Sequence, residues 1–159
     1  MYLLFPVSYS FSETTDEIPP TVGFNIKTFL SGHFKVNVWD VGGQKSIRSF
    51  WRNYFDTTDG LVWVVDSSDK SRLLDCKKEL ETVLIEKRLS GAPLLVLANK
   101  QDLPGSLTVA EICQILEIDR IQRNRNCAVF ACSVFQRDSI VDGMEWIIKD
   151  IGNRMYLLR

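Results

Sequence analysis

The sequence lacks an excess of charge of either sign and lacks long apolar runs. Nineteen Lys and Arg face 20 Asp and Glu, for a net charge of −1. A nearly neutral chain creates no long-range field that would gather nucleic acid or an anionic membrane. No apolar run approaches the about 20 residues that cross a bilayer. We therefore expect neither a nucleic-acid partner nor a transmembrane segment.

Metal ligands and disulfide frameworks are also scarce. The only histidine is His33, which we expect in a solvated turn, and the four cysteines contain no CxxC pair and no zinc-ligand spacing. The cysteines lie in apolar stretches, where free thiols behave as small buried hydrophobes. We interpret them as structural thiols in a reducing cytosol and expect a cytoplasmic protein. They are Cys76, Cys113, Cys127 and Cys132.

The first residues carry no recognisable targeting signal. Residues 1–11 are apolar and aromatic, but they have no basic start and no small-residue cleavage site, so they make a poor signal peptide. Position 2 is Tyr2, and the glycine that N-myristoylation requires is missing. We treat residues 1–10 as an atypical N-terminal segment. A length of 159 residues, 45% of them hydrophobic, is typical of one soluble globular domain.

Hydrophobic patterning predicts several strands. Residues 24–30 and 34–39 alternate between apolar and polar side chains around a short turn, which predicts an antiparallel hairpin with one buried face. Residues 60–66 and 93–99 are continuous apolar runs, as in parallel strands that are covered on both faces. The pattern of residues 128–132 predicts one more short strand.

Helical patterns separate these strands. They cover residues 71–89, a segment that begins near Thr108, and residues 140–155. Strand–helix alternation predicts a three-layer α/β fold, with a mostly parallel sheet and one antiparallel hairpin edge. Such sheets bind ligands at the carboxyl ends of their strands. Polar residues stand at these ends, namely Asp40, Asp66, Asn99 and the pair Cys132-Ser133.

The tetrapeptide Asn99-Lys100-Gln101-Asp102 follows a buried strand and has the chemistry of purine recognition. A carboxylate at Asp102 can accept both the ring N–H and the exocyclic amine of guanine, a donor pair that adenine lacks. Asn99 offers an amide to the base edge or to neighbouring loops, and the stem of Lys100 can lie flat along the ring. The alternative is a polar turn with no ligand.

Four motifs in a fixed order resemble those of the ADP-ribosylation factor-like small GTPases. They are Pro20-Thr21-Val22-Gly23-Phe24-Asn25, Asp40-Val41-Gly42-Gly43-Gln44, Asn99-Lys100-Gln101-Asp102 and Cys132-Ser133-Val134. The resemblance runs from about residue 11 to the end and implies a small-GTPase-like domain over residues 11–159. It also implies a guanine-nucleotide switch with GTP or GDP and Mg²⁺ as cofactors.

The resemblance assigns roles on the phosphate side of the site. Thr21 would close over Mg²⁺ in the triphosphate state, and Asp40 would reach the ion through water. The backbone N–H of Gly43 would meet the γ-phosphate, where a Cβ would block close approach. Gln44 would orient the attacking water as the catalytic residue.

The resemblance also assigns roles in binding the base and the effector. Asn99, Lys100 and Asp102 would hold guanine, and the Cys132-Ser133 loop would donate backbone N–H groups to it, although Val134 stands where alanine is more usual. The aromatic residues that would form an effector surface are Phe24, Trp39 and Tyr54. The other interpretation of these three is that they are core aromatics. Implied partners are a tubulin-folding cofactor and lipid-carrier proteins.

The phosphate-binding loop GxxxxGK(S/T) is absent from these 159 residues, because none of the nine glycines begins it. The family carries this loop after its first strand, and here residues 1–10 occupy that place. We therefore expect the first strand and first helix to be missing or replaced. Residues 2–5 are the candidate for a short replacement strand, and Pro6 is expected to end it.

Loss of the loop predicts weak or absent nucleotide binding. About five charge-assisted hydrogen bonds, at roughly 1.5–3 kcal/mol each, amount to about 7–15 kcal/mol. A nanomolar ligand would then bind in the millimolar range or not at all, and GTP hydrolysis would be lost. Two hypotheses follow. One is a guanine-nucleotide switch, and the other is a truncated isoform that binds effectors without nucleotide.

Overall fold

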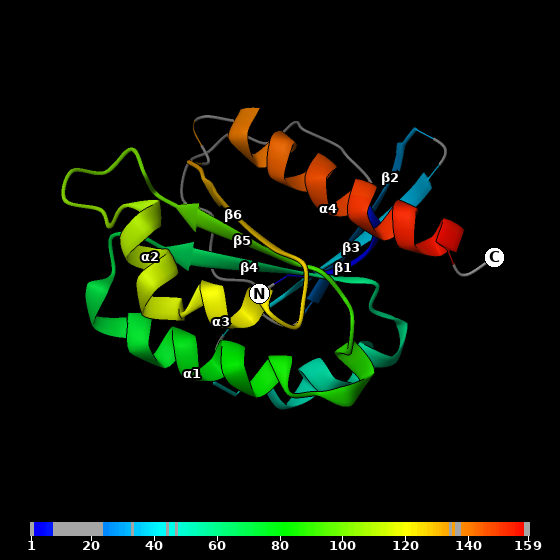
Figure 1. Cartoon of the computed structure of the whole chain (residues 1–159), viewed down its shortest axis with the longest axis horizontal. Coiled ribbons are helices and arrows are strands. Elements are labelled where there is room, and N and C mark those ends of the chain that lie inside the picture. The colour runs from blue at the N-terminus through cyan, green and yellow to red at the C-terminus, as the bar shows by residue number, and fades with distance from the viewer. Residues whose placement is uncertain are drawn as a thin grey trace.

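In the computed structural model, a single six-stranded sheet lies between two helical layers, with α4 on one face and α1, α2 and α3 on the other (Figure 1). The three-layer α/β prediction is confirmed. The residues that the structure describes are 2–7, 24–32, 34–43, 45–46, 48–133, 135 and 138–157. His33, for which we predicted a solvated turn, lies outside them.

The strands and helices follow the predicted order closely. The strands are β1 (Tyr2–Val7), β2 (Phe24–Ser31), β3 (Phe34–Val41), β4 (Gly60–Asp66), β5 (Leu94–Asn99) and β6 (Cys127–Ala131). The α-helices are α1 (Leu73–Leu84), α2 (Val109–Leu116), α3 (Ile118–Gln122) and α4 (Asp138–Leu157). The 3₁₀ segments are η1 (Arg48–Thr57), η2 (Lys70–Arg72) and η3 (Lys87–Leu89). The helix expected over residues 71–89 is thus divided among η2, α1 and η3.

The sheet order is β2-β3-β1-β4-β5-β6, so β1 fills the position between β3 and β4. The strands β4, β5 and β6 are parallel, and β2 and β3 form the predicted hairpin. β1 runs antiparallel to both of its neighbours, with Tyr2 opposite Asp40 on one side and opposite Val62 on the other. The antiparallel part is therefore larger than the predicted hairpin edge, and the sheet is mixed rather than mostly parallel.

The replacement strand that we predicted at residues 2–5 is present, but Pro6 does not end it. β1 continues to Val7, which lies opposite Val36. The register shifts between Leu4 and Val7. Proline has no N–H to donate, so the irregularity falls where the ladder loses a hydrogen-bond donor, and the strand resumes after it.

The continuous apolar run of β5 is buried on both faces, as predicted. Leu94 and Val96 pack into a core beneath α1 and α2, while Leu95 and Leu97 pack against α4. Leu94, Leu95 and Val96 are all 0% exposed. This strand anchors the loop that follows it, since neither face can shift without opening a core.

The predicted helix start near Thr108 is confirmed by a capping box. The Thr108 hydroxyl accepts a hydrogen bond from the Glu111 N–H at 3.3 Å, and the Glu111 carboxylate accepts one from the Thr108 N–H at 2.8 Å. Neither α3 nor η1 was predicted. In η1, Trp51 and Phe55 are buried four residues apart and tie this segment to the core.

All four cysteines are free thiols, two of them buried and two half-buried. Burial raises the pKa of Cys127 to about 12 and that of Cys132 to about 11. This supports their interpretation as structural thiols. In the part of the chain that the structure describes, no helix is both long enough and apolar enough to cross a membrane.

Candidate functional site

The carboxyl ends of β4, β5 and β6 meet at one edge of the sheet. Asp66 lies in register with Asn99, and Ala98 lies in register with Ala131. The loops that begin at Lys100 and Cys132 therefore start beside each other. This edge is where ligands of parallel sheets bind.

The backbone of the Asn99–Asp102 loop turns at Lys100, which has a φ of +66° in the left-handed region. The Lys100 carbonyl accepts hydrogen bonds from the Leu103 N–H at 3.1 Å and the Ser106 hydroxyl at 2.7 Å. Few non-glycine residues adopt this conformation, and those that do cluster at functional sites. The loop is thus held in a defined shape.

Gln101 joins the two loops, a role that motif reasoning missed. Its N–H donates to the Cys132 carbonyl at 3.1 Å. Its side-chain amide donates to the Ser67 hydroxyl at 2.8 Å and to the Leu107 carbonyl at 2.9 Å. Ser67 is 0% exposed and directly follows β4, and a polar residue at such a strand end was the one available signal.

Lys100 forms an ion pair with Asp66, with 2.7 Å between its Nζ and the Asp66 Oδ2. Asp66 also accepts hydrogen bonds from the Ser68 N–H at 3.0 Å and the Ser68 hydroxyl at 2.6 Å. Burial alone would raise the pKa of Asp66, but the hydrogen bonds from Lys100 and Ser68 outweigh it and hold the pKa below its ordinary value. The ammonium group is thereby fixed across the strand ends.

Asp102 and Asn99 differ in their surroundings. Asp102 is exposed, and its carboxylate makes no hydrogen bond or ion pair with any described residue. Asn99 is half-buried, with its Oδ1 3.9 Å from the Cys132 Sγ. The carboxylate that would select guanine is available to solvent, while the asparagine is set into the junction of the two loops.

The second loop is equally well anchored. The Cys132 N–H donates to the Ala98 carbonyl at 2.9 Å, and the Ser133 hydroxyl accepts from the Phe135 N–H at 3.2 Å. Ser133 is 0% exposed, and Val134 lies outside the described residues. The structure therefore brings together all five residues predicted on the base side, namely Asn99, Lys100, Asp102, Cys132 and Ser133.

The phosphate side is only partly described. Asp40 is half-buried near the end of β3, opposite Asn25. Thr21 and Gln44 lie outside the described residues, so their roles stay predictions. A Cβ built on Gly43 would meet no described atom within 4 Å, and its backbone is not left-handed, so nothing in the described fold requires glycine there. A glycine without a packing role fits a close approach by a ligand.

The direction of β1 separates it from this edge. Leu4 lies opposite Gly60, the first residue of β4, so the chain leaves β1 at the edge remote from Asp66 and Asn99. A phosphate loop that follows a parallel first strand would instead emerge at the ligand-binding edge. β1 thus ends at the edge opposite to the one from which such a loop emerges.

Two of the three predicted effector aromatics contact each other. The rings of Trp39 and Tyr54 lie 4.5 Å apart between centroids, at 43° to each other. Both are half-buried and pack against the core beneath α1. Each ring therefore contributes to the core and is also partly accessible at the surface. Opposite Trp39, Ile26 is 44% exposed. The Phe24 side chain lies outside what the structure describes.

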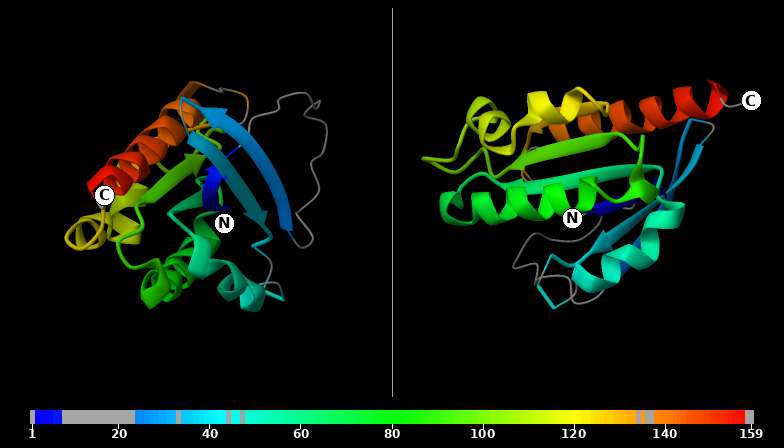
Figure 2. Two further views of the ribbon diagram at one scale, coloured as in Figure 1. Left: turned by 90° about the vertical axis from the view of Figure 1, so that its right-hand side faces the viewer. Right: turned by 60° about the horizontal axis from the view of Figure 1, so that its bottom comes forward.

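A cavity of about 410 Å³ lies between η1, β4 and α1. Its lining runs from Gly43, just after β3, to Asp66 at the carboxyl end of β4, so the cavity reaches the strand ends. Trp51, Trp63 and Cys76 line it, and the Trp63 indole N–H donates to the Cys76 Sγ at 3.1 Å. Figure 2 shows the hairpin and η1 at the end of the molecule opposite to α2.

Comparison with known proteins agrees with this architecture. The profile of the ADP-ribosylation factor family matches residues 8–151. The proteins named ADP-ribosylation factor-like protein 2 from Arabidopsis thaliana and Drosophila melanogaster are each 51% identical to the chain over 146 residues, which cover 92% of the chain and 79% of each relative. ADP-ribosylation factor-like protein 3 from Chlamydomonas reinhardtii is 48% identical over 87% of the chain and 78% of the relative.

A solved structure has the same fold. The Arl6 BBS3 small GTPase from Trypanosoma brucei, with bound nucleotide analogue GppNp, superposes with a TM-score of 0.79 at 32% identity, over 89% of this chain and 86% of that one. β1 lies outside the segment that the family profile matches, whereas the base-side loops lie within it. The chain belongs to the ADP-ribosylation factor family.

Proposed function

We propose that this chain is an interaction protein of the ADP-ribosylation factor family that binds effector proteins without depending on a guanine nucleotide. The observation that carries this proposal is the antiparallel course of β1 between β3 and β4. The position that a phosphate-loop strand needs is filled, and it is filled in the direction that leads away from the site.

The base side of the site fits guanine, but the phosphate side does not fit a triphosphate. Asn99, Lys100 and Asp102 would hold the base, and their loop is rigidly tied. Without the cradle, about 7–15 kcal/mol of phosphate contacts are missing, and base contacts cannot replace them. GTP, GDP and Mg²⁺ would then bind weakly or not at all. Gln44 can position water only against a phosphate that other groups hold.

The surface around Trp39 and Tyr54 supports the interaction role. Half-buried aromatics next to the exposed Ile26 offer a large, rigid contact area with little side-chain entropy to lose. Phe50 lies in η1, the segment that also carries Tyr54, and is 57% exposed. Proteins of the tubulin-folding cofactor and lipid-carrier types are the partners that we propose for this surface.

A guanine-nucleotide switch is the second candidate, and two observations favour it. The chain belongs to a family of small GTPases, and the related Arl6 BBS3 protein was solved with a bound nucleotide analogue. The tied base loops are also the arrangement that guanine binding needs. This candidate requires a phosphate cradle from another source.

Titration calorimetry with GDP and GTP, each with Mg²⁺, separates the two candidates. A complete ADP-ribosylation factor-like protein 2 serves as the positive control. We expect dissociation constants in the millimolar range or weaker and no GTP turnover, with Gln44→Leu leaving both unchanged. A submicromolar dissociation constant, or turnover that Gln44→Leu abolishes, would support the switch and overturn our proposal.

Effector binding gives the complementary measurement. Binding of a lipid-carrier protein should be the same with GTP, with GDP and after nucleotide removal. Ile26→Ser should weaken it, whereas Leu74→Ser should not, because Leu74 lies on α1, although at 64% exposure it is even more accessible than Ile26 at 44%. Binding that appears only with GTP would favour the switch.

A further inference from the structure

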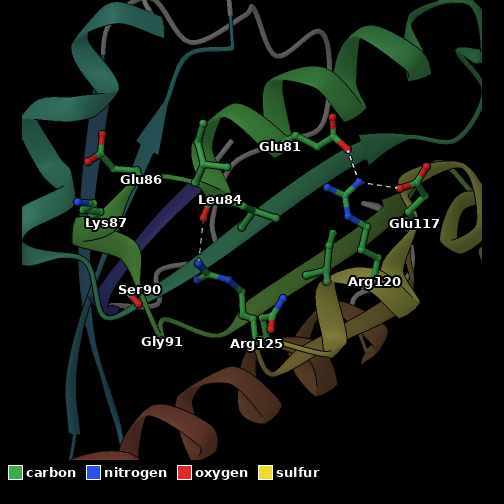
Figure 3. A pocket seen from close by; sticks show the side chains of 12 residues that line it. Glu81, Leu84, Glu86, Lys87, Ser90, Gly91, Glu117, Arg120 and Arg125 are labelled. Carbon is green, nitrogen blue, oxygen red and sulfur yellow. Dashed lines mark hydrogen bonds and ion pairs between the residues drawn. The ribbon is translucent and has the colours of Figure 1, made fainter.

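A cavity of about 610 Å³ lies between the C-terminal end of α1, η3 and α3 (Figure 3). We name it the α1–α3 groove. Ser90 and Gly91, just before β5, also line it, so it lies at the sheet edge remote from Asn99. The nucleotide-binding edge and the aromatic surface do not use it. The groove residues that matter below are Leu84, Ile85, Lys87, Arg120, Ile121 and Arg125.

The groove has an apolar floor that is continuous with the core. Leu84 and Ile121 are half-buried and pack against the core beneath α1 and α2. Beside them Ile85, at the end of α1, is 79% exposed. A single exposed apolar side chain is ordinary in a soluble protein. Here it extends a buried apolar surface into an open groove, which is the geometry of a binding site.

The carboxylates that line the groove are already neutralised. Arg120 pairs with Glu81 at 3.6 Å and with Glu117 at 3.1 Å, as the dashed lines in Figure 3 show, and Glu117 also pairs with Lys77 at 2.5 Å. Glu86 pairs with Arg88 at 3.1 Å. Each of these three carboxylates therefore already has a cationic partner.

Two cations of the groove are not neutralised. Within the described residues, neither Lys87 nor Arg125 has a carboxylate partner. The Arg125 guanidinium donates to the Leu89 carbonyl at 2.8 Å, to the Ala92 carbonyl, and to the Leu84 carbonyl at 3.4 Å. Carbonyl dipoles orient the guanidinium but carry no net charge. Burial lowers the pKa of Arg125, so this cation would gain from a carboxylate beside it.

We infer that the α1–α3 groove docks an acidic, amphipathic segment of a partner protein. Its apolar side chains would cover Ile85, Leu84 and Ile121, and a carboxylate between them would face Lys87 and Arg125. We expect the partner segment to carry negative charge, because the charges in the groove that have no partner of opposite sign among the described residues are all positive. This interface would act in addition to the aromatic surface and is independent of nucleotide.

Selection from a phage-displayed library of random helical 14-residue peptides tests the inference on the full chain. Enriched peptides are synthesised with a fluorescent label, and their affinity is measured by anisotropy. We expect sequences with apolar residues at helical spacing and a central Glu or Asp. Changing that acid to the amide should weaken binding to the unmodified chain about tenfold, and much less to a Lys87→Glu chain.

Matched variants locate the binding site. Lys87→Glu should weaken binding by about tenfold and Ile85→Gln by about fivefold or more. Lys78→Glu and Leu74→Gln make the same chemical changes on exposed positions of α1 outside the groove, and they should leave affinity within about twofold. All four positions are exposed, so thermal melting should confirm an intact fold in each variant.

Three outcomes would overturn the inference. The first is enrichment that persists on the Ile85→Gln chain, or no groove-dependent enrichment at all. The second is a consensus without acidic residues. The third is concentration-dependent self-association that Ile85→Gln abolishes, which would make a second copy of the chain the occupant. None of these variants touches Trp39, Tyr54 or β1, so effector and nucleotide binding are scored separately.

Discussion

The two halves of the sheet are both held by backbone hydrogen bonds, but they differ in the edge at which their strands end. In the β4–β5–β6 half, parallel strands end at one edge, and Gln101 connects their loops through the Cys132 carbonyl and Ser67. In the β2–β3–β1 half, β1 completes both neighbouring ladders but sends the chain to the other edge. The first half therefore holds the two loops of the predicted base site at one edge, while β1 in the second half ends at the opposite edge.

This difference shows that a sheet and a ligand site place different demands on a strand. A sheet needs backbone donors and acceptors at the right spacing, and an antiparallel strand supplies them as well as a parallel one. A phosphate site needs a loop at the carboxyl edge, and only a parallel strand leads directly into it. The sheet can thus be completed by a strand of either direction, whereas the loss of nucleotide binding that we propose would follow from the direction of β1.

The largest effect is expected from a chimera in which the first strand runs parallel to β4 and leads into a phosphate loop. Residues 1–19 are replaced by the first strand, phosphate loop and first helix of ADP-ribosylation factor-like protein 2. Because the restored contacts are worth about 7–15 kcal/mol, GDP affinity should rise by at least about 10⁵-fold. Calorimetry measures it.

The matched control is the same chimera with the lysine of the phosphate loop changed to alanine, which should lose most of the gain. A folded chimera that still binds GDP only at millimolar concentration would show that the base side is itself defective. The proposal would then need a different physical cause.

The next largest effect is expected from breaking β1. Leu3 pairs with Trp39 on one side and Leu61 on the other, so β1 is an interior strand. Deleting residues 1–10 removes several backbone hydrogen bonds of about 1 kcal/mol each, and about 1 kcal/mol shifts the midpoint of a domain this size by about 2–4 °C or slightly more. We expect the thermal midpoint to fall by about 5 °C or more, with more dye-detectable apolar surface.

Leu3→Pro should have a similar effect, because proline removes a ladder donor from an interior strand, whereas Leu3→Val should be mild. If the midpoint is unchanged after the deletion, β1 does not complete the sheet in solution. The halves would then differ by a missing strand rather than by a reversed one.

Much of the fold was predictable because buried strands and helices have characteristic patterns of apolar residues. The continuous apolar run of β5 indicated a strand covered on both faces, and Thr108 with Glu111 marked a helix start. The direction of β1 was not predictable, since Tyr2–Val7 reads equally well as a strand in either direction. A strand at this position can pair its backbone with β3 and β4 in either direction, so only the tertiary arrangement selects one of them.

The site shows the same division. That Asn99, Lys100 and Asp102 share one loop at the strand ends was predictable from the sequence, whereas their role in binding guanine stays a prediction. The contacts of Gln101 were not predictable, because its partners Ser67 and Leu107 come together only in the folded chain. The roles of Thr21, Asp40, Gly43 and Gln44 stay predictions, as does the effector role of the aromatic residues.

A smaller effect is expected from removing the Gln101 side chain, which joins the loops after β4 and β5. Gln101→Ala leaves the buried Ser67 hydroxyl and the Leu107 carbonyl without the amide that they contact, so the free energy of unfolding should fall by about 1–3 kcal/mol. Asp102→Ala removes an exposed carboxylate and should change it by less than about 0.5 kcal/mol. Urea unfolding of both variants measures the contrast. Equal losses would show that Asp102 also supports the loop.

The smallest effect concerns the ion pair at the strand ends. Asp66 has a pKa below its ordinary value of 3.8, because hydrogen bonds from Lys100 and Ser68 outweigh its burial. A carboxyl group with a lowered pKa in the folded state stabilises the fold above its unfolded pKa, and this contribution is lost as pH falls through the folded pKa. Lys100→Met should therefore raise the pKa of Asp66, which carboxyl ¹³C NMR can follow.

At neutral pH the same change should cost less than about 1 kcal/mol, because the Lys100 and Asp66 side chains are 45% and 32% exposed and solvent screens the pair. Lys78→Met, on the outer face of α1, is the control and should leave the Asp66 titration unchanged. A pKa of Asp66 that does not move in Lys100→Met would mean that the ammonium is not held across the strand ends in solution. Lys100 would then be free to lie along a purine ring, and the base half of the site would be poised for a ligand rather than closed on its own ion pair.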